Sequence, residues 1–253
     1  MPGRDVAPAR SLPDPERVDA VAGPGARPRG PASWRLASCA TSDPADPSSL
    51  HPEEALLVAG ARPDRVVEFA TGRHCARTAL RQLGVDDAAH PVLADPRGAP
   101  SWPPGVVGSI THTSGWTGAV AARRGGRGGI ASLGLDAEPA AALPPGVLEV
   151  VATDRERAAL DRLGGVDGSV PWGAVLFAAK EAAYKAWYPL TGVVLHHGQV
   201  EVELSTGGRF RAQVSSTGVG SGAARRLVRG RWRLGPTAVV TLGVVSAPWS
   251  GPG

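Results

Sequence analysis

The stretch Phe177-Ala-Ala-Lys-Glu-Ala-Ala-Tyr-Lys-Ala-Trp-Tyr-Pro189 places charged side chains in an alanine-rich, apolar segment. Alanine, lysine and glutamate are strong helix formers, and Pro189 lacks the N–H that would continue a helix, so the pattern predicts a helix that ends there. Glu181 and Lys185 are four residues apart and share one helix face. They form either a surface ion pair worth roughly a few tenths of a kcal/mol or part of a site, and this segment alone favours the ion pair.

The composition indicates a globular protein with an acidic partner. The chain has 253 residues, enough to bury a large core, with a formal charge of +4 and a pI near 9.7. Arginine far outnumbers lysine, which suits nucleic acid, a phosphorylated small molecule or an acidic protein, although coding bias produces the same composition. Nucleic acid is not expected, because no helix-turn-helix, zinc-finger or RNP-like pattern is present.

The sequence predicts a cytoplasmic location. No apolar run approaches the roughly 20 residues needed to span a bilayer. The N-terminus has no apolar core of the kind that a secretory signal needs. Cys39 and Cys75 show neither metal-ligand spacing nor a secreted disulfide framework, so we expect both to be packing residues in a reducing compartment.

Hydrophobic periodicity predicts an α+β fold behind a disordered extension at residues 1–31, with ordered structure from about Trp34. Helices are expected at 51–60, 64–83 and 153–163, the last ending at a glycine pair, and strands at 106–110, 117–122, 130–135, 200–204, 210–214, 231–234 and 238–245. The first three strands are expected to form an antiparallel meander. The element order suggests two halves, an N-terminal subdomain at 32–130 and a C-terminal subdomain at 131–247.

Two features of these elements suggest a site. Arg73, Arg77 and Arg81 form a basic ridge on the helix at 64–83, either a phosphate site or a solvated face. Asp136 and Glu138 end the strand that starts at residue 130, and because they are two residues apart they point to the same side. They form either a solvated acidic strand end or, through oxygen ligands, a site for Mg²⁺ or Mn²⁺ rather than zinc.

Taken together, the motifs resemble those of the 4′-phosphopantetheinyl transferases, in the larger Sfp-like class and most closely its enterobactin-synthetase branch. The resemblance covers roughly residues 50 to 204 in unbroken order. The matching segments are Glu68–Leu80, Gly98–Gly105, Gly108–Thr113, Gly134–Glu138 and Phe177–Lys185.

The resemblance implies a fold of two pseudo-symmetric subdomains, each with a small antiparallel sheet packed on a long helix, with coenzyme A in the cleft between them. It implies a monomeric enzyme that transfers the 4′-phosphopantetheine arm of coenzyme A to a serine of an apo acyl or peptidyl carrier protein and releases adenosine 3′,5′-bisphosphate. Mg²⁺, or Mn²⁺, would bridge the pyrophosphate. Siderophore or other secondary metabolism is the expected setting, and the choice among fatty-acid, polyketide and nonribosomal-peptide carriers stays open.

The resemblance also implies residue roles. Asp136, Glu138 and Glu181 are the expected metal ligands. Glu181 and Lys185 are the expected catalytic residues: Glu181 or a metal-bound water accepts the serine proton, and Lys185 faces the pyrophosphate. The expected coenzyme-binding residues are Arg65, Arg73, Thr111, His112, Asp136, Lys180 and Lys185. Lys180 could instead serve the carrier or solvate its helix.

Some positions depart from the family pattern without affecting the expected chemistry. Ala178 and Thr113 stand where the family often has serine and cysteine, and Ala137 cannot ligate metal, so water would complete that coordination. Carrier contacts are expected from Leu143–Val151 and from Trp187 and Tyr188. The alternatives are a noncatalytic coenzyme A or nucleotide-binding module, which the full carboxylate set argues against, and nucleic-acid binding through the arginines.

Overall fold

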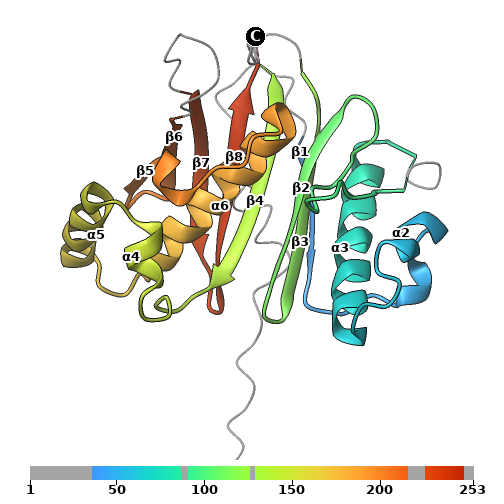
Figure 1. Cartoon of the computed structure of the whole chain (residues 1–253), viewed down its shortest axis with the longest axis horizontal. Coiled ribbons are helices and arrows are strands. Elements are labelled where there is room, and N and C mark those ends of the chain that lie inside the picture. The colour runs from blue at the N-terminus through green and yellow to red at the C-terminus, as the bar shows by residue number, and fades with distance from the viewer. Residues whose placement is uncertain (1–35, 87–90, 126–128, 216–225, 248–253) are drawn as a thin grey trace, which may run out of the picture.

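The computed structural model describes residues 36–86, 91–125, 129–215 and 226–247, so the extension expected at 1–31 lies outside it. The fold is α+β, as predicted, with two antiparallel sheets that each pack on one long helix (Figure 1). Its helices are α2 (Pro52–Leu56), α3 (Pro63–Gln82), α4 (Val147–Val151), α5 (Asp154–Val166) and α6 (Trp172–Thr191), with short 3-10 turns η1 (Pro47–Ser49) and η2 (His197–Gln199).

The N-terminal half is a three-stranded sheet in the order β1 (Leu36–Thr41), β3 (Trp116–Arg123), β2 (Val106–Thr113), with α3 packed on it. Strand β1 was not predicted. Its sequence, Leu-Ala-Ser-Cys-Ala-Thr, is short and rich in small residues, and it becomes a strand through pairing with β3, from Leu36 opposite Ala122 to Thr41 opposite Thr117. Such pairing is a long-range contact that local pattern does not reveal.

The C-terminal half is a five-stranded sheet in the order β4 (Ile130–Pro139), β8 (Ala238–Ser246), β7 (Arg226–Leu234), β6 (Arg209–Val214), β5 (Val200–Ser205), covered by α6. The predicted hairpin of β5 and β6 is confirmed, with Val200, Val202 and Val214 buried. The predicted three-strand meander is wrong: β4 leaves the first sheet and pairs with β8, more than a hundred residues later in the chain.

The two sheets meet along their edge strands β2 and β4 (Figure 1). One apolar cluster spans this junction, with Val107 and Val120 from the first sheet and Leu133 and Leu135 from the second. The Ser109 hydroxyl donates across it to the Leu135 carbonyl, at 3.5 Å. The ends of β2 and β4 are therefore held next to each other.

Three helix boundaries differ from the prediction. Helix α2 ends at Leu56, and α5 continues through the glycine pair to Val166. Pro189 lies inside α6, which ends only at Thr191 and is followed by Gly192 as its C-cap, with φ of 67°. Proline removes one backbone hydrogen bond, but the buried Trp187 anchors the last turn, and its carbonyl accepts a bond from the Thr191 hydroxyl. Among the described residues no helix combines the length and apolarity needed to cross a membrane.

Candidate active site

Close packing of α6 on β4 brings the predicted catalytic residues together. Gly134 lies in β4 under α6, where a Cβ atom would stand 1.9 Å from the Ala182 carbonyl oxygen. Only glycine therefore allows the helix to lie this close to the strand. The alternation of β4 then turns Ala137 into the apolar core, while Asp136, two residues after Gly134, faces α6.

The centre of the site is a three-residue contact between the two halves. The Lys185 ammonium on α6 donates to Asp136 Oδ1, at 2.6 Å, and to the Thr111 hydroxyl of β2, at 3.2 Å. The Thr111 hydroxyl in turn donates to Asp136 Oδ1, at 3.3 Å. Thr111 and Asp136 are buried, whereas 30% of the Lys185 side chain is exposed. The ammonium is thus anchored at one side and open to a ligand at the other.

Three carboxylates crowd this centre. Burial, the charge of Asp136 and the charge of Glu181 together raise the pKa of Glu138 to about 7, against the opposing effect of Lys185. Burial and the charge of Asp136 also raise the pKa of Glu181. Burial and the neighbouring negative charge thus both favour the protonated forms of Glu138 and Glu181.

A divalent cation fits this chemistry. Asp136 Oδ2 is buried without a hydrogen-bond partner among the described residues, and such an atom needs a ligand. In the described part of the chain, however, no three His, Cys, Asp or Glu side chains are already arranged to hold a metal ion. The donor atoms suit Mg²⁺, but the ligand set is not preformed.

Beside this centre lies a basic cavity of about 280 Å³. Six of the seven predicted coenzyme-binding residues line it, namely Arg65, Arg73, Thr111, His112, Asp136 and Lys185. The buried Arg73 guanidinium stacks 4.0 Å above the Phe69 ring, and burial lowers the pKa of Arg73 to about 10, so it keeps its charge at neutral pH. The cavity therefore offers cations to an anionic ligand.

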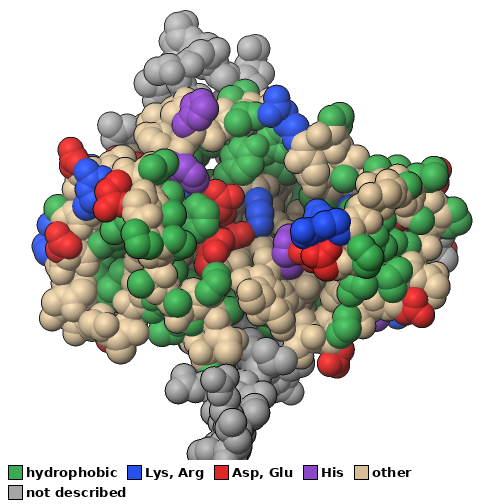
Figure 2. All heavy atoms as spheres, turned by 60° about the horizontal axis from the view of Figure 1, so that its bottom comes forward, with side chains coloured by type: hydrophobic (Ala, Val, Ile, Leu, Met, Phe, Trp, Pro, Cys, Tyr) green, Lys and Arg blue, Asp and Glu red, His purple; other side chains and the backbone are tan. Residues whose placement is uncertain are grey.

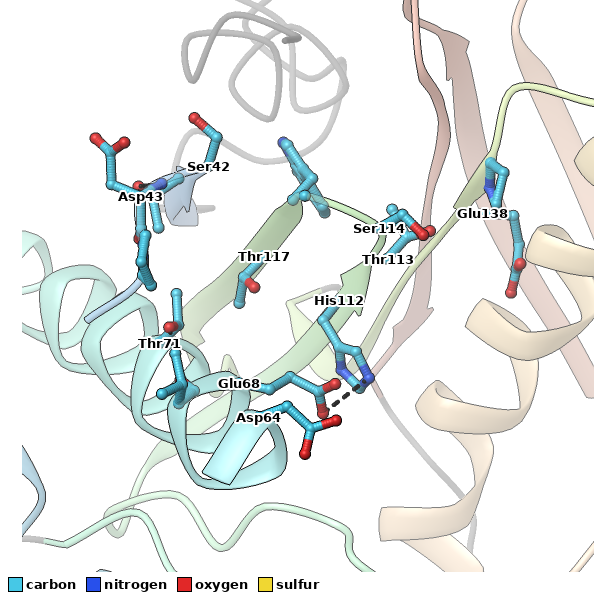
Figure 3. Close-up of a pocket in the computed structure, with 16 residues that line it drawn as sticks. Ser42, Asp43, Asp64, Glu68, Thr71, His112, Thr113, Ser114, Thr117 and Glu138 are labelled. Carbon is cyan, nitrogen blue, oxygen red and sulfur yellow. Dashed lines mark hydrogen bonds and ion pairs between the residues drawn. The ribbon is translucent and has the colours of Figure 1, made fainter. Parts of the chain in front are cut away.

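Glu68 of α3 organises the mouth of this cavity. Its Oε1 lies 3.0 Å from His112 Nε2 (Figure 3). The same oxygen also pairs with Arg65. Burial, Arg65 and Lys185 lower the pKa of His112. On the other side of this pair is a more open hollow of about 620 Å³, which Glu138 borders from the opposite sheet (Figure 3). Figure 2 shows acidic, basic and histidine side chains gathered in the hollow at the middle of the molecule.

Lys180 is the one predicted coenzyme-binding residue that does not line the basic cavity. Its ammonium, on a side chain only 1% exposed, pairs with Glu156 at 2.8 Å. It also donates to the carbonyls of Val151, at 2.8 Å, and His197, at 2.9 Å. Because these acceptors use its three donors, the structure contradicts both a coenzyme contact and a solvated surface role for Lys180.

The predicted arginine ridge on α3 is also divided. Arg73 lines the basic cavity, whereas Arg77 pairs with the buried Glu54, at 2.7 Å, and Arg81 is exposed. Glu54 lies 23 residues before Arg77 in the sequence, so the pattern of the helix alone does not reveal this ion pair.

Comparison with known proteins identifies the family. A model of the 4′-phosphopantetheinyl transferase N-terminal domain matches residues 53–122, and a model of the 4′-phosphopantetheinyl transferase superfamily matches residues 132–234. The chain is 47% identical to the 4′-phosphopantetheinyl transferase Svp of Streptomyces mobaraensis over 221 residues, which is 85% of this chain and 87% of the relative. It belongs to the 4′-phosphopantetheinyl transferase family.

Two further relatives carry the same family name. The 4′-phosphopantetheinyl transferase PptT of Mycobacterium tuberculosis is 44% identical, over 79% of this chain and 87% of its own length. The 4′-phosphopantetheinyl transferase Npt of Nocardia iowensis is 37% identical, over 76% and 87% respectively. As a 4′-phosphopantetheinyl transferase, the chain is an enzyme that uses coenzyme A and modifies carrier proteins.

Sequence reasoning missed two contributors to the site of this 4′-phosphopantetheinyl transferase. Glu68 lies within a motif that carried the resemblance but received no role, and it contacts both Arg65 and His112. Asp95 lies outside the matching segments and received no role, and it accepts a hydrogen bond from Tyr188 of α6. The i, i+3 spacing of Arg65 and Glu68 was a usable signal for the first, whereas no local pattern reveals the second.

Proposed function

We propose that this 4′-phosphopantetheinyl transferase performs its reaction where Lys185, Asp136 and Thr111 meet. The reaction moves the 4′-phosphopantetheine arm of coenzyme A to a serine hydroxyl of an apo carrier protein and releases adenosine 3′,5′-bisphosphate. The observation that carries the proposal is the convergence of a buried carboxylate, a partly exposed ammonium and a basic cavity at the junction of the two halves.

We propose that the N-terminal half binds the anionic end of coenzyme A. Arg65, Arg73 and His112 line one cavity with the Thr111 hydroxyl, and arginine is suited to phosphate recognition. Arg73 is held by its ring contact to Phe69 and needs little reorganisation on binding. These side chains would position the coenzyme so that its pyrophosphate reaches Lys185.

We propose that the C-terminal half supplies the reacting groups. The Lys185 ammonium would stabilise the charge that builds on the pyrophosphate as the nucleotide leaves. Glu181 has a raised pKa, which brings it closer to neutral pH, and it would accept the proton of the attacking serine. Asp136, Glu138 and Glu181 would hold Mg²⁺, which supplies positive charge at the pyrophosphate and offsets the repulsion between the three carboxylates.

The test is intact-mass measurement of a carrier. Purified protein, coenzyme A, Mg²⁺ and an apo carrier should yield a carrier heavier by one phosphopantetheine, and Glu181→Gln should abolish most of this shift. Asp161→Asn, at an exposed position on α5, is the matched control and should behave as the wild type. Absence of a shift with fatty-acid, polyketide and nonribosomal-peptide carriers would refute the proposal.

The finer assignments are part of the same proposal. The order and type of its motifs support placing this enzyme in the enterobactin-synthetase branch of the Sfp-like class. We propose that it acts in siderophore or other secondary metabolism. The change of sheet between Arg123 and Ile130 supports subdomains at 32–130 and 131–247. We also propose a cytoplasmic monomer with no nucleic-acid partner, and light scattering of the purified protein would test the monomer.

A further inference from the structure

The loop at residues 94–100, here called the Asp95 loop, is built around one carboxylate. Asp95 Oδ1 accepts the backbone N–H groups of Arg97 and Ala99, each at 2.9 Å. The loop closes through a bridge between Ala94 and Pro100, and Gly98, with φ of 86°, makes the turn. The carboxylate thus fixes the shape of a segment that lies between α3 and β2 in the sequence.

The Asp95 loop forms a wall of the candidate site. Gly98 and Pro100 line the basic cavity that contains Arg73 and Lys185. The same two residues line a neighbouring cavity of about 170 Å³, whose other side is formed by Glu181, Tyr184, Lys185 and Tyr188 of α6. The separation of the loop from α6 therefore sets the width of both cavities.

A side-chain hydrogen bond joins this loop to α6. The Tyr188 hydroxyl donates to Asp95 Oδ2 at 2.9 Å, across 93 residues of sequence. Tyr188 is three residues after Lys185 and seven after Glu181, so all three lie on one face of the helix. The hydrogen bond to Asp95 raises the pKa of Tyr188, which keeps its hydroxyl protonated as a donor.

We propose that the Tyr188–Asp95 hydrogen bond is a latch that holds the Asp95 loop at its working distance from α6, which makes Tyr188 and Asp95 positioning residues for coenzyme A. This inference rests on the proposed function of the site. Tyr188 and Asp95 act through the cavity walls, whereas Lys185 and Asp136 keep their own contacts to each other and to Thr111 when the latch is broken. Loss of the latch should therefore weaken coenzyme binding and leave the chemical step nearly unchanged.

The experiment is a double-mutant cycle on the full chain with Tyr188→Phe and Asp95→Ala. Tyr188→Phe should raise the KM for coenzyme A about 3- to 10-fold, with kcat within about twofold, because only one charge-assisted hydrogen bond is lost. Asp95→Ala should raise KM further, since it also removes the turn. The double variant should match Asp95→Ala, because the latch can be lost only once.

The conservative variant Asp95→Asn separates the latch from a merely structural role. Its carbonyl oxygen can still accept the turn N–H groups, and its amide can donate to the Tyr188 hydroxyl, so KM should stay close to the wild-type value. A Tyr188→Phe variant with unchanged KM, a loss confined to kcat, or independent effects in the double variant would overturn the proposal.

Calorimetric titration of coenzyme A without a carrier tests the latch apart from turnover. The dissociation constant should rise in Tyr188→Phe by the same factor as KM. A wild-type protein that binds coenzyme A but modifies no carrier would refute the proposed function alone, whereas equal coenzyme affinity in Tyr188→Phe and wild type would refute the latch alone.

Discussion

Each half of the molecule contains a buried glutamate, and the two glutamates make the same three kinds of contact. Glu54 is the third residue of α2 and Glu156 is the third residue of α5, and each closes a capping box with the residue before its helix. Each also accepts a backbone N–H from the segment after the long helix, from Val92 at 2.9 Å and from Val202 at 2.7 Å. Each pairs with a base on that long helix, Arg77 in the first half and Lys180 in the second.

The sheets repeat in the same way. The order β1-β3-β2 in the first half corresponds to β4-β8-β7 in the second, and the hairpin of β5 and β6 is an addition to the second sheet. The shared strand order and the matching buried glutamates identify one structural unit that occurs twice, although the two halves show no visible sequence repeat. The strand order and the buried glutamates therefore carry the pseudo-symmetry that the motif resemblance implied.

The difference between the halves lies in what each long helix presents at the junction. Helix α3 supplies Arg65 and Arg73 to the basic cavity. Helix α6 supplies Lys185 and Glu181 beside Asp136. Under the proposed function, one scaffold would support the coenzyme-binding groups in one copy and the reacting groups in the other. Variants of the two copies should therefore fail in different ways.

The largest expected effect comes from disrupting the buried Lys180–Glu156 pair of the C-terminal half. Lys180→Met should lower the free energy of unfolding by about 3–5 kcal/mol, because it leaves Glu156 buried and unpaired. Arg77→Met should cost less, about 1–3 kcal/mol, since the Arg77 side chain is 15% exposed and water can replace part of its contact. Urea denaturation measures both. Equal losses would show that burial does not distinguish the two copies.

The next effect concerns the chemical role of α6. Glu181→Gln should reduce kcat for carrier modification about 10²- to 10³-fold, because the amide can neither accept the serine proton nor offer a full charge to a cation. The melting temperature should stay the same or rise, since the variant removes one of three mutually repelling carboxylates. A variant with more than about a tenth of the wild-type kcat would contradict the assigned role.

A smaller effect is expected from the first half. Arg73→Ala should raise the KM for coenzyme A about 10- to 30-fold with a lesser change in kcat, because it removes a buried cation that we propose binds phosphate. Arg81→Ala on the same helix is the matched control, since Arg81 is exposed and outside the cavity, and its kinetics should be unchanged. A loss confined to kcat in Arg73→Ala would contradict the division of roles.

The smallest effect is a pH dependence of stability in EDTA. Folding raises the pKa of Glu138 from 4.5 to about 7, so the folded state binds a proton more tightly than the unfolded state. This stabilisation is complete below about pH 4.5 and is lost as the pH rises through about 7. Because the group is half exposed, the wild-type melting temperature should fall only about 1–3 °C more than that of Glu138→Gln between pH 5 and 8. Parallel curves would show that Glu138 is not crowded by its neighbours.

Local pattern was sufficient for the elements that carry the site. The helix around Glu181 and Lys185 follows from composition, and the shared side of Asp136 and Glu138 follows from strand alternation. Long-range pairing was not accessible. The partner of β4, the existence of β1 and the acceptors of Lys180 all depend on residues far away in the sequence, as does the Tyr188–Asp95 contact.

The contact at Gly134 fixes the distance between α6 and β4, and with it the geometry of the site. The distance between α6 and β4 depends on the absence of a Cβ atom at Gly134. In Gly134→Ala the added Cβ would clash with the Ala182 carbonyl and would push α6 away from β4. Because Lys185 and Glu181 are on α6, a displacement of this helix from β4 would move both away from Asp136. The geometry of the site therefore depends on a position in β4 that carries no side chain.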